Sequence, residues 1–175
     1  MSASLPLDIL KKYKKDYKIF FESGTNEGDS VQTALDAGFE RIISVELDEE
    51  IYRRANRRFS AFPQVTILHG LTTQMLEVFL PALQEKVLFF LDGHPDATSG
   101  MTPIMDEIDL IRNHSYSDLI MGDDARLMGK AKWESATIEE IYRHVLLKSP
   151  HYGMILEPNG HDPRDLMVFY PREQK

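Results

Sequence analysis

Residues 19–30 of this chain read IFFESGTNEGDS: an apolar run, an acid, and then two glycines four positions apart. The apolar run, residues 19–21, is typical of a short buried strand. After the second glycine, apolar residues recur at helical spacing and end at Gly38. A strand, a glycine turn and a helix in this order let the backbone approach a nucleotide closely and direct a helix N-terminus toward it.

The same alternation of strand and helix continues along the chain. Further strands are predicted at residues 41–47, 65–68, 86–91, 118–121, 154–156 and 166–170. Pro81 is expected to interrupt the helix after the third strand, and Pro103 to occupy the first position of the helix after the fourth. Thr137 and Glu140 form a capping box for the last helix. The pattern predicts an α/β, three-layer, Rossmann-like fold whose seven-stranded sheet is mainly parallel and ends in an antiparallel strand pair.

Composition limits the class of protein. With 175 residues, 42% hydrophobic and 27% charged, we expect one domain over residues 19–175. Residues 1–18 form a polar, lysine-rich extension, interpreted as a solvated helix leading into the domain, with a lid or a homo-oligomer contact as the alternative. A net charge of −8 argues against nucleic acid as a partner, and the absence of cysteine excludes disulfides and thiolate sites. No signal peptide or membrane-length apolar run is present, so a cytoplasmic location is expected.

Polar residues follow five of the predicted strands: Glu22, Glu46, His69, Asp92 and Asp123. Each one alone could be a loop residue or a helix cap. Because ligands of such sheets bind at the carboxyl ends of the strands, five polar residues at one edge indicate a binding site there.

Glu46 is the candidate for binding a ribose. It lies 18 positions after Gly28, at the end of the next strand, where an acid can accept hydrogen bonds from both ribose hydroxyls. The alternative is that Glu46 caps the following helix, although Asp48 is better placed for that role. The turn itself, Gly24-x-x-x-Gly28, lacks the middle glycine of dinucleotide-binding folds, and Glu22 would repel a phosphate. A ligand with a cationic or amine group is therefore favoured over a nicotinamide dinucleotide.

Over residues 18–170 the chain resembles the class I S-adenosylmethionine-dependent methyltransferases. The resemblance implies that the acid and glycines of the turn match the family's first motif, that Glu46 is its ribose-binding acid, and that Asp92 lies beside the methyl donor. Residues 19–175 would then be a methyltransferase-like domain. The implied donor-binding residues are Glu22, Gly24, Thr25, Gly28, Ser30, Glu46, Leu47, His69, Gly70 and Asp92.

A narrower resemblance links the runs LDGH at 91–94 and GDD at 122–124 to the macrocin-type sugar O-methyltransferases, which use a divalent metal. It implies that Asp92, Asp123 and Asp124 are metal ligands, with Mg²⁺ as the expected ion. The alternative is that these acids only form turns. The family has a second acid where this chain has His94. A histidine can also serve as general base, but His94 could instead be a ligand or a loop residue.

These observations together predict metal-assisted methyl transfer from S-adenosylmethionine to a hydroxyl of a small molecule, a sugar among the candidates, with His94 and Asp92 as catalytic residues. The acceptor would be enclosed by residues 95–101 and 126–133, where Arg126 and Lys130 either hold an anionic group or are solvated. Two alternatives remain: a non-catalytic binding or scaffold domain of the same fold, and an NAD-dependent oxidoreductase.

Overall fold

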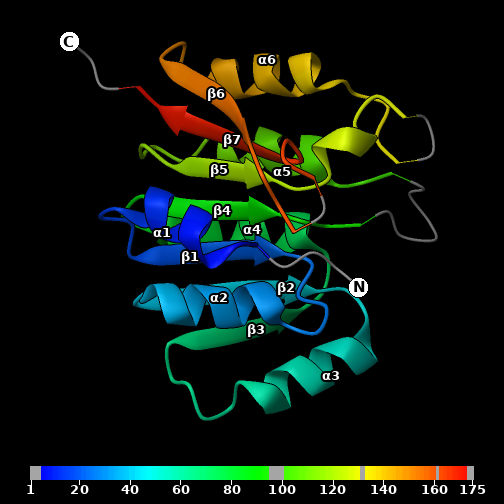
Figure 1. Ribbon diagram of the computed structural model, residues 1–175. Helices are drawn as coiled ribbons and strands as arrows, with labels where there is room; N and C mark the ends of the chain where they lie inside the picture. Colours follow the sequence, from blue (N-terminus) through cyan, green and yellow to red (C-terminus); the bar gives the residue numbers. More distant parts are fainter. Residues whose placement is uncertain (1–4, 95–100, 131–132, 161, 173–175) are drawn as a thin grey trace.

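The computed structural model describes residues 5–94, 101–130, 133–160 and 162–172 (Figure 1). Its centre is a seven-stranded sheet with the order β3-β2-β1-β4-β5-β7-β6. The first five strands run parallel, and β7 is antiparallel to both β5 and β6. The predicted fold class is confirmed. The strands are β1 (Ile19–Ser23), β2 (Arg41–Glu46), β3 (Val65–His69), β4 (Val87–Leu91), β5 (Leu119–Gly122), β6 (Tyr152–Glu157) and β7 (Leu166–Pro171).

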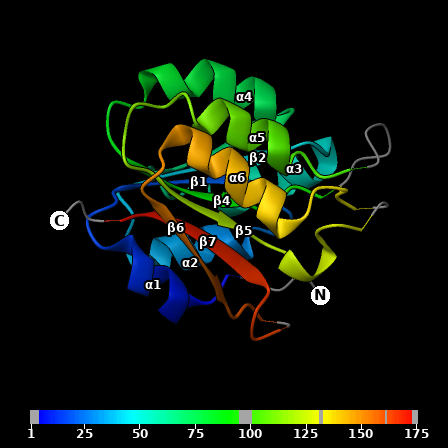
Figure 2. The same cartoon turned by 90° about the horizontal axis from the view of Figure 1, so that it is seen from above.

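Helices cover both faces of the sheet (Figure 2). Helices α1 (Leu7–Lys14), α2 (Asp29–Ala37) and α3 (Glu49–Arg58) pack on one face. Helices α4 (Thr72–Phe79), α5 (Ile104–Ile111) and α6 (Ile138–Lys148) pack on the other. Strands β1 and β4 are buried along their whole length because both faces are covered, which explains the unbroken apolar sequence of β4 and the apolar start of β1. None of the helices in the described ranges has the length and apolar character needed to cross a bilayer.

Two prolines shape the ends of helices. Pro81 lies in the short 3₁₀ turn Leu80–Ala82 that follows α4, so the predicted interruption is confirmed. Pro103 is the N-cap of α5 and not its first helical residue, so that prediction was one position off. At either position the absence of a proline N–H is harmless, because that donor has no partner inside the helix.

The lysine-rich N-terminal segment packs on the domain through its apolar side. Ile9 and Leu10 of α1 are buried in the core shared with α2, while Lys12 is exposed at its side. Lys12 and the Tyr13 hydroxyl both donate to the carboxylate of Glu157, at 2.6 and 2.5 Å. The helix is therefore fixed to the end of β6 as well as to the core.

The strand order creates a crevice at the carboxyl end of the sheet. From β1 the chain moves outward to β2 and β3, then returns to place β4 on the opposite side of β1. Helices α2 and α4 therefore leave the sheet toward opposite faces, and a space opens between the ends of β1 and β4. Such reversal points are where open α/β sheets bind their ligands.

Candidate functional site

A cavity of about 850 Å³ lies at the carboxyl ends of β1, β2 and β4. Its size is that of a site for a small molecule or cofactor. Five of the predicted donor-binding residues line it: Gly24, Glu46, Leu47, Gly70 and Asp92. The remaining lining residues are Asn26, Val45, Asp48, Ile51, 71–73, Gly93, His94, 101–103 and Asp106.

The turn after β1 lies directly against the end of β4. Gly24 has φ +81, and a Cβ at this position would lie 2.6 Å from the carbonyl oxygen of Asp92. Its N–H donates to the carbonyl of Val45 at 2.9 Å, which fixes the turn to β2 as well. Gly28 has φ +82 and is the N-cap of α2, where an added Cβ would overlap the ring of Phe59. The backbone therefore requires glycine at both positions. Gly24 also allows the turn after β1 to lie against the end of β4, two parts of the cavity wall.

Glu22 lies behind this turn and does not line the cavity. It is fully buried, and its carboxylate accepts hydrogen bonds from the hydroxyls of Ser30 and Ser44. Burial raises the pKa of Glu22 to about 8, although the two hydroxyls act in the opposite direction. The Thr25 hydroxyl contacts that of Ser44 at 2.6 Å. Three predicted donor-binding residues, Glu22, Thr25 and Ser30, thus form one buried network with Ser44, which was not predicted as a site residue. The part of the three residues in donor binding stays a prediction.

Glu46 is held in a fixed orientation at the cavity wall. One carboxylate oxygen accepts from the backbone N–H of Asn26 and the other from that of Asp48, both at 2.9 Å. Asp48 itself caps α3 by accepting from two backbone N–H groups, so it holds the capping position that the sequence favoured for it. Each oxygen of Glu46 keeps a further lone pair for a ligand.

Apolar side chains continue this wall. Leu47, Ile51 and Leu71 line the cavity, and Leu47 and Leu71 are exposed large hydrophobic residues. Gly70 lies between β3 and this group. His69, which the sequence placed at the site, is directed elsewhere: its Nε2 lies 3.1 Å from the Leu47 carbonyl, and it does not line the cavity. A flat apolar ring is the ligand group that such a surface accommodates best.

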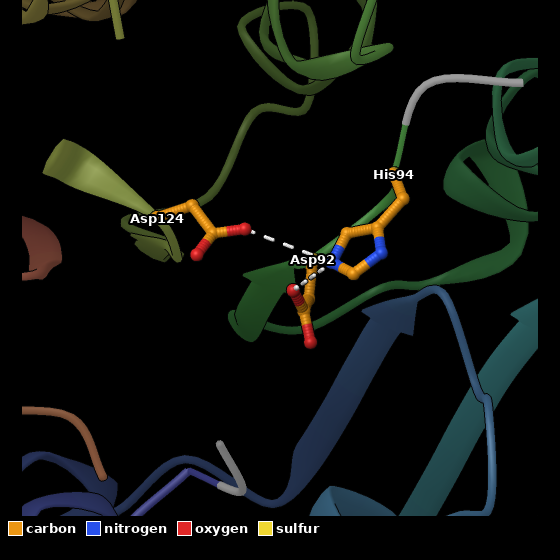
Figure 3. Close-up of side chains that lie close together, drawn as sticks. All are labelled: Asp92, His94 and Asp124. Carbon is orange, nitrogen blue, oxygen red and sulfur yellow. Dashed lines mark ion pairs between the residues drawn. The ribbon is translucent and has the colours of Figure 1, made fainter. Parts of the chain in front are cut away.

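At the other end of the cavity, His94 faces two acids (Figure 3). Its Nε2 lies 3.6 Å from Asp92 and 3.6 Å from Asp124. The interaction with Asp92 raises the pKa of His94, and burial raises the pKa of Asp92. The ring of Trp133 packs edge-on against the imidazole of His94, with 5.1 Å between the two ring centroids. Asp124 adopts φ +57, a left-handed conformation uncommon outside glycine and tolerated best by Asp and Asn.

A second acidic cluster adjoins the first. It consists of Asp123, Asp124 and Asp165, whose carboxylates lie within 4.8 Å of one another. Arg126 is their counter-ion: it lies 2.8 Å from Asp124 and also contacts the fully buried Asp165. The Asn159 amide donates to Asp123 at 2.7 Å, while burial raises the pKa of Asp123 to about 6.

The predicted metal ligands are therefore shared between two clusters. Asp92 and Asp124 lie with His94, whereas Asp123 lies with Asp165. All three predicted ligands also line a small space of about 10 Å³, the volume of a single water or ion. The carboxylates of Asp92 and Asp124 suit Mg²⁺ or Mn²⁺, and the imidazole of His94 would favour a transition-metal ion over Mg²⁺, so the group fits a divalent ion. The second cluster already contains a cation in Arg126.

Two residues of these clusters were not found from the sequence. Asp165 and Asn159 belong to the segment between β6 and β7, where no site residue was predicted. Arg126, predicted to hold an anionic group or to be solvated, instead pairs with Asp124 and Asp165. The predicted acceptor enclosure falls partly outside the described residues, at 95–100 and 131–132; within them, Met101 lines the large cavity and Trp133 the small one.

No protein-family model and no curated protein matches the sequence. Solved structures do match it. An O-methyltransferase from Bacillus cereus in complex with S-adenosylhomocysteine has a TM-score of 0.67 at 12% identity, covering 95% of this chain and 78% of that chain. The O-methyltransferase TomG from Streptomyces achromogenes, solved with S-adenosylmethionine, gives 0.63 at 14%, covering 95% and 79%. The N-terminal domain of EvdMO1, solved in the presence of S-adenosylhomocysteine and D-fucose, gives 0.62 at 11%, covering 99% and 85%.

These similarities establish the fold. The chain shares the Rossmann-like fold of these solved structures over almost its whole length. A fold of this kind serves many reactions, so the reaction itself must be argued from the site.

Proposed function

We propose that this protein is an S-adenosylmethionine-dependent methyltransferase that acts on a hydroxyl group of a small molecule. The observation that carries the proposal is the cavity between β1, β2 and β4, where Glu46 is held in place by two backbone N–H groups and the Gly24 turn meets the end of β4. The fold of methyltransferases solved with this donor or its product supports it.

The two ends of the cavity suit the two ends of the donor. Glu46 would accept hydrogen bonds from the ribose hydroxyls, with Leu47 and Leu71 beside the adenine. At the other end, Asp92 would place negative charge near the sulfonium. The predicted contribution of Glu22, Thr25 and Ser30 would be indirect, through the position of the turn.

His94 is the proposed general base. The hydrogen-bonding interaction with Asp92 raises the pKa of His94 and so makes its imidazole a better proton acceptor for an acceptor hydroxyl, and Asp92 and Asp124 would stabilise the imidazolium that results. A divalent ion at Asp92 and Asp124, with Asp123 beside them, would lower the pKa of the acceptor oxygen by Lewis-acid polarisation. If His94 itself binds that ion, it cannot also be the base, and the proton would pass to an acid or to water.

The acceptor class is proposed as sugar-like. The resemblance of residues 91–94 and 122–124 to the macrocin-type enzymes supports this choice, as does the likeness in fold to a domain solved with D-fucose. Asp106 and Thr102, which line the same cavity as His94, are side chains of the kind that bind sugar hydroxyls.

The first test is calorimetry with S-adenosylhomocysteine. We expect the wild-type protein to bind, and Glu46→Ala to bind about tenfold or more weakly, because two charge-assisted hydrogen bonds are lost. Glu49→Ala is the matched control, since Glu49 is exposed and forms an ion pair with Arg53 across one helical turn. Equal affinity of wild type and Glu46→Ala would remove Glu46 from the donor site.

Transfer of a labelled methyl group from S-adenosylmethionine to a panel of sugars and phenols, with and without Mg²⁺, then separates the alternatives. Turnover supports the enzyme. Donor binding without turnover on any acceptor supports the non-catalytic domain, and binding of NAD in place of S-adenosylhomocysteine would favour an oxidoreductase.

A further inference from the structure

Glu107 of helix α5 is a buried acid that makes no hydrogen bond to any of the described residues. It is fully buried, and among the described residues its two carboxyl oxygens are the only buried side-chain polar atoms that make no hydrogen bond. Such burial is strongly unfavourable, so an unsatisfied group of this kind in a folded protein calls for an explanation. The proposed methyl-transfer scheme does not use this residue.

Two hydroxyl groups approach the Glu107 carboxyl. Ser23, the last residue of β1, and Thr72, the first residue of α4, have hydroxyls close enough to lower the pKa of Glu107, although neither makes a regular hydrogen bond with it. Burial outweighs them and raises the pKa of Glu107 to about 8, with the charges of Asp106 and Asp92 acting in the same direction. At neutral pH the group is therefore a carboxylic acid, with one O–H to donate and oxygens to accept.

Both hydroxyls belong to elements that form the cavity. The Ser23 Oγ accepts a hydrogen bond from the backbone N–H of Asp92 at 3.2 Å. Asp92 in turn lines the cavity proposed to bind the methyl donor. Thr72 lines the cavity too, at the start of a helix whose N-terminus has no side-chain cap. Glu107 thus lies where the ends of β1, β4 and α4 meet, directly behind the cavity wall.

We infer that Glu107 is a positioning residue of the donor site, whose carboxyl lies against the hydroxyls of Ser23 and Thr72 and so holds the Asp92 turn and the start of α4 in the geometry that binds the donor. The inference rests on the proposed function. A merely structural role is a poor explanation, because an apolar side chain of the same size would fill the space between α4 and α5 without a desolvated carboxyl.

The test compares Glu107→Leu and Glu107→Gln in the full chain, by calorimetry with S-adenosylhomocysteine and by thermal unfolding. The leucine variant is expected to unfold at the wild-type temperature or above, yet to bind about tenfold more weakly, the scale of a lost hydrogen-bonded contact. The glutamine variant keeps a donor and an acceptor and should restore binding to within about threefold. Asp109→Asn is the matched control: it lies on the same helix, is half-exposed, and pairs with His144.

Wild-type affinity in Glu107→Leu would overturn the inference while leaving the proposed function intact. So would a glutamine variant as weak as the leucine variant, because the amide supplies the same pair of hydrogen-bonding groups. If the leucine variant does not fold, Glu107→Met provides the same comparison. Failure of the wild-type protein to bind S-adenosylhomocysteine would overturn the proposed function, and this inference with it.

Discussion

The Nε2 atom of His94 lies 3.6 Å from Oδ2 of Asp124, across the ends of β4 and β5 (Figure 3). The same nitrogen lies 3.6 Å from Asp92. One imidazole therefore joins the acids of two neighbouring strands, and its protonation state depends on both of them.

The first prediction concerns the titration of His94. Because Asp92 and the neighbouring acids favour the imidazolium, His94 in protein treated with EDTA should titrate above the ordinary histidine value of about 6.5. Asp124→Asn removes one of these charges and should move the titration to lower pH. The measurement is NMR of the imidazole protons across the pH range. A titration at or below the ordinary value in the wild-type protein would show that the imidazole does not lie against these acids in solution.

A divalent ion is expected to bind at Asp92 and Asp124. Calorimetry with Mn²⁺ should show binding that falls by about tenfold or more in Asp92→Asn and in Asp124→Asn, since each removes a charged ligand. Asp123→Asn should weaken binding less, because the Asn159 amide already occupies one of its oxygens. Asp36→Asn, an exposed acid on α2, is the control. Unchanged Mn²⁺ binding in Asp92→Asn and Asp124→Asn would refute the metal site.

Gly24→Ala tests the contact between the glycine turn and β4. The new Cβ would lie 2.6 Å from the Asp92 carbonyl oxygen and would also be strained at φ +81, so the turn or the strand end must move. We expect a loss of more than about 2 kcal/mol in unfolding free energy, together with loss of donor binding. Gly38→Ala has the same φ with open space around the Cβ. It should lose only about 1 kcal/mol and bind the donor normally. Equal effects of Gly24→Ala and Gly38→Ala on donor binding would show that the contact between the glycine turn and β4 is not needed for donor binding.

The sequence was sufficient for the fold because each element carries its own local determinants. Strands buried on both faces appear as unbroken apolar runs, as at residues 87–91, and the capping box of Thr137 and Glu140 marks the start of α6. The edge at which ligands bind follows from the parallel order of the strands, which is why Glu46 and Asp92, predicted at that edge, line the cavity.

The details of the site were less accessible, because strand position does not specify the direction of a side chain. His69 is the last residue of β3 and Glu22 the last but one of β1, yet neither lines the cavity. Asp165 lies in the acidic cluster because β7 pairs antiparallel with β5. No local sequence pattern predicts that this residue lies beside Asp123 and Asp124. The burial of Glu107, in contrast, is consistent with its position in the sequence. Its helical spacing from Ile104 and Ile111 places it on the buried face of α5.

Arg126 is predicted to be essential for stability because it neutralises a buried acid. Arg126→Met would leave the fully buried Asp165 without its charged partner and should lower the unfolding free energy by about 3 kcal/mol. Arg143→Met is the control: its partner Glu139 is exposed, and the expected change is within about 0.5 kcal/mol. Urea unfolding measures both. Similar values for the two variants would mean that Asp165 does not depend on the guanidinium.

The last prediction concerns the pH dependence of stability and follows from Glu22. Its pKa is about 8 in the folded chain, against an ordinary value of 4.5, so between these limits the folded protein binds more protons than the unfolded chain does. Stability should therefore fall as the pH rises from 4.5 to 8, with Glu22 contributing up to about 1.4 kcal/mol per pH unit. Glu107 and His114, whose pKa values are also raised, act in the same direction. Urea unfolding at several pH values should show a shallower dependence in Glu22→Gln, because the amide does not titrate; parallel curves for variant and wild type would show that Glu22 is ionised in the folded protein at neutral pH.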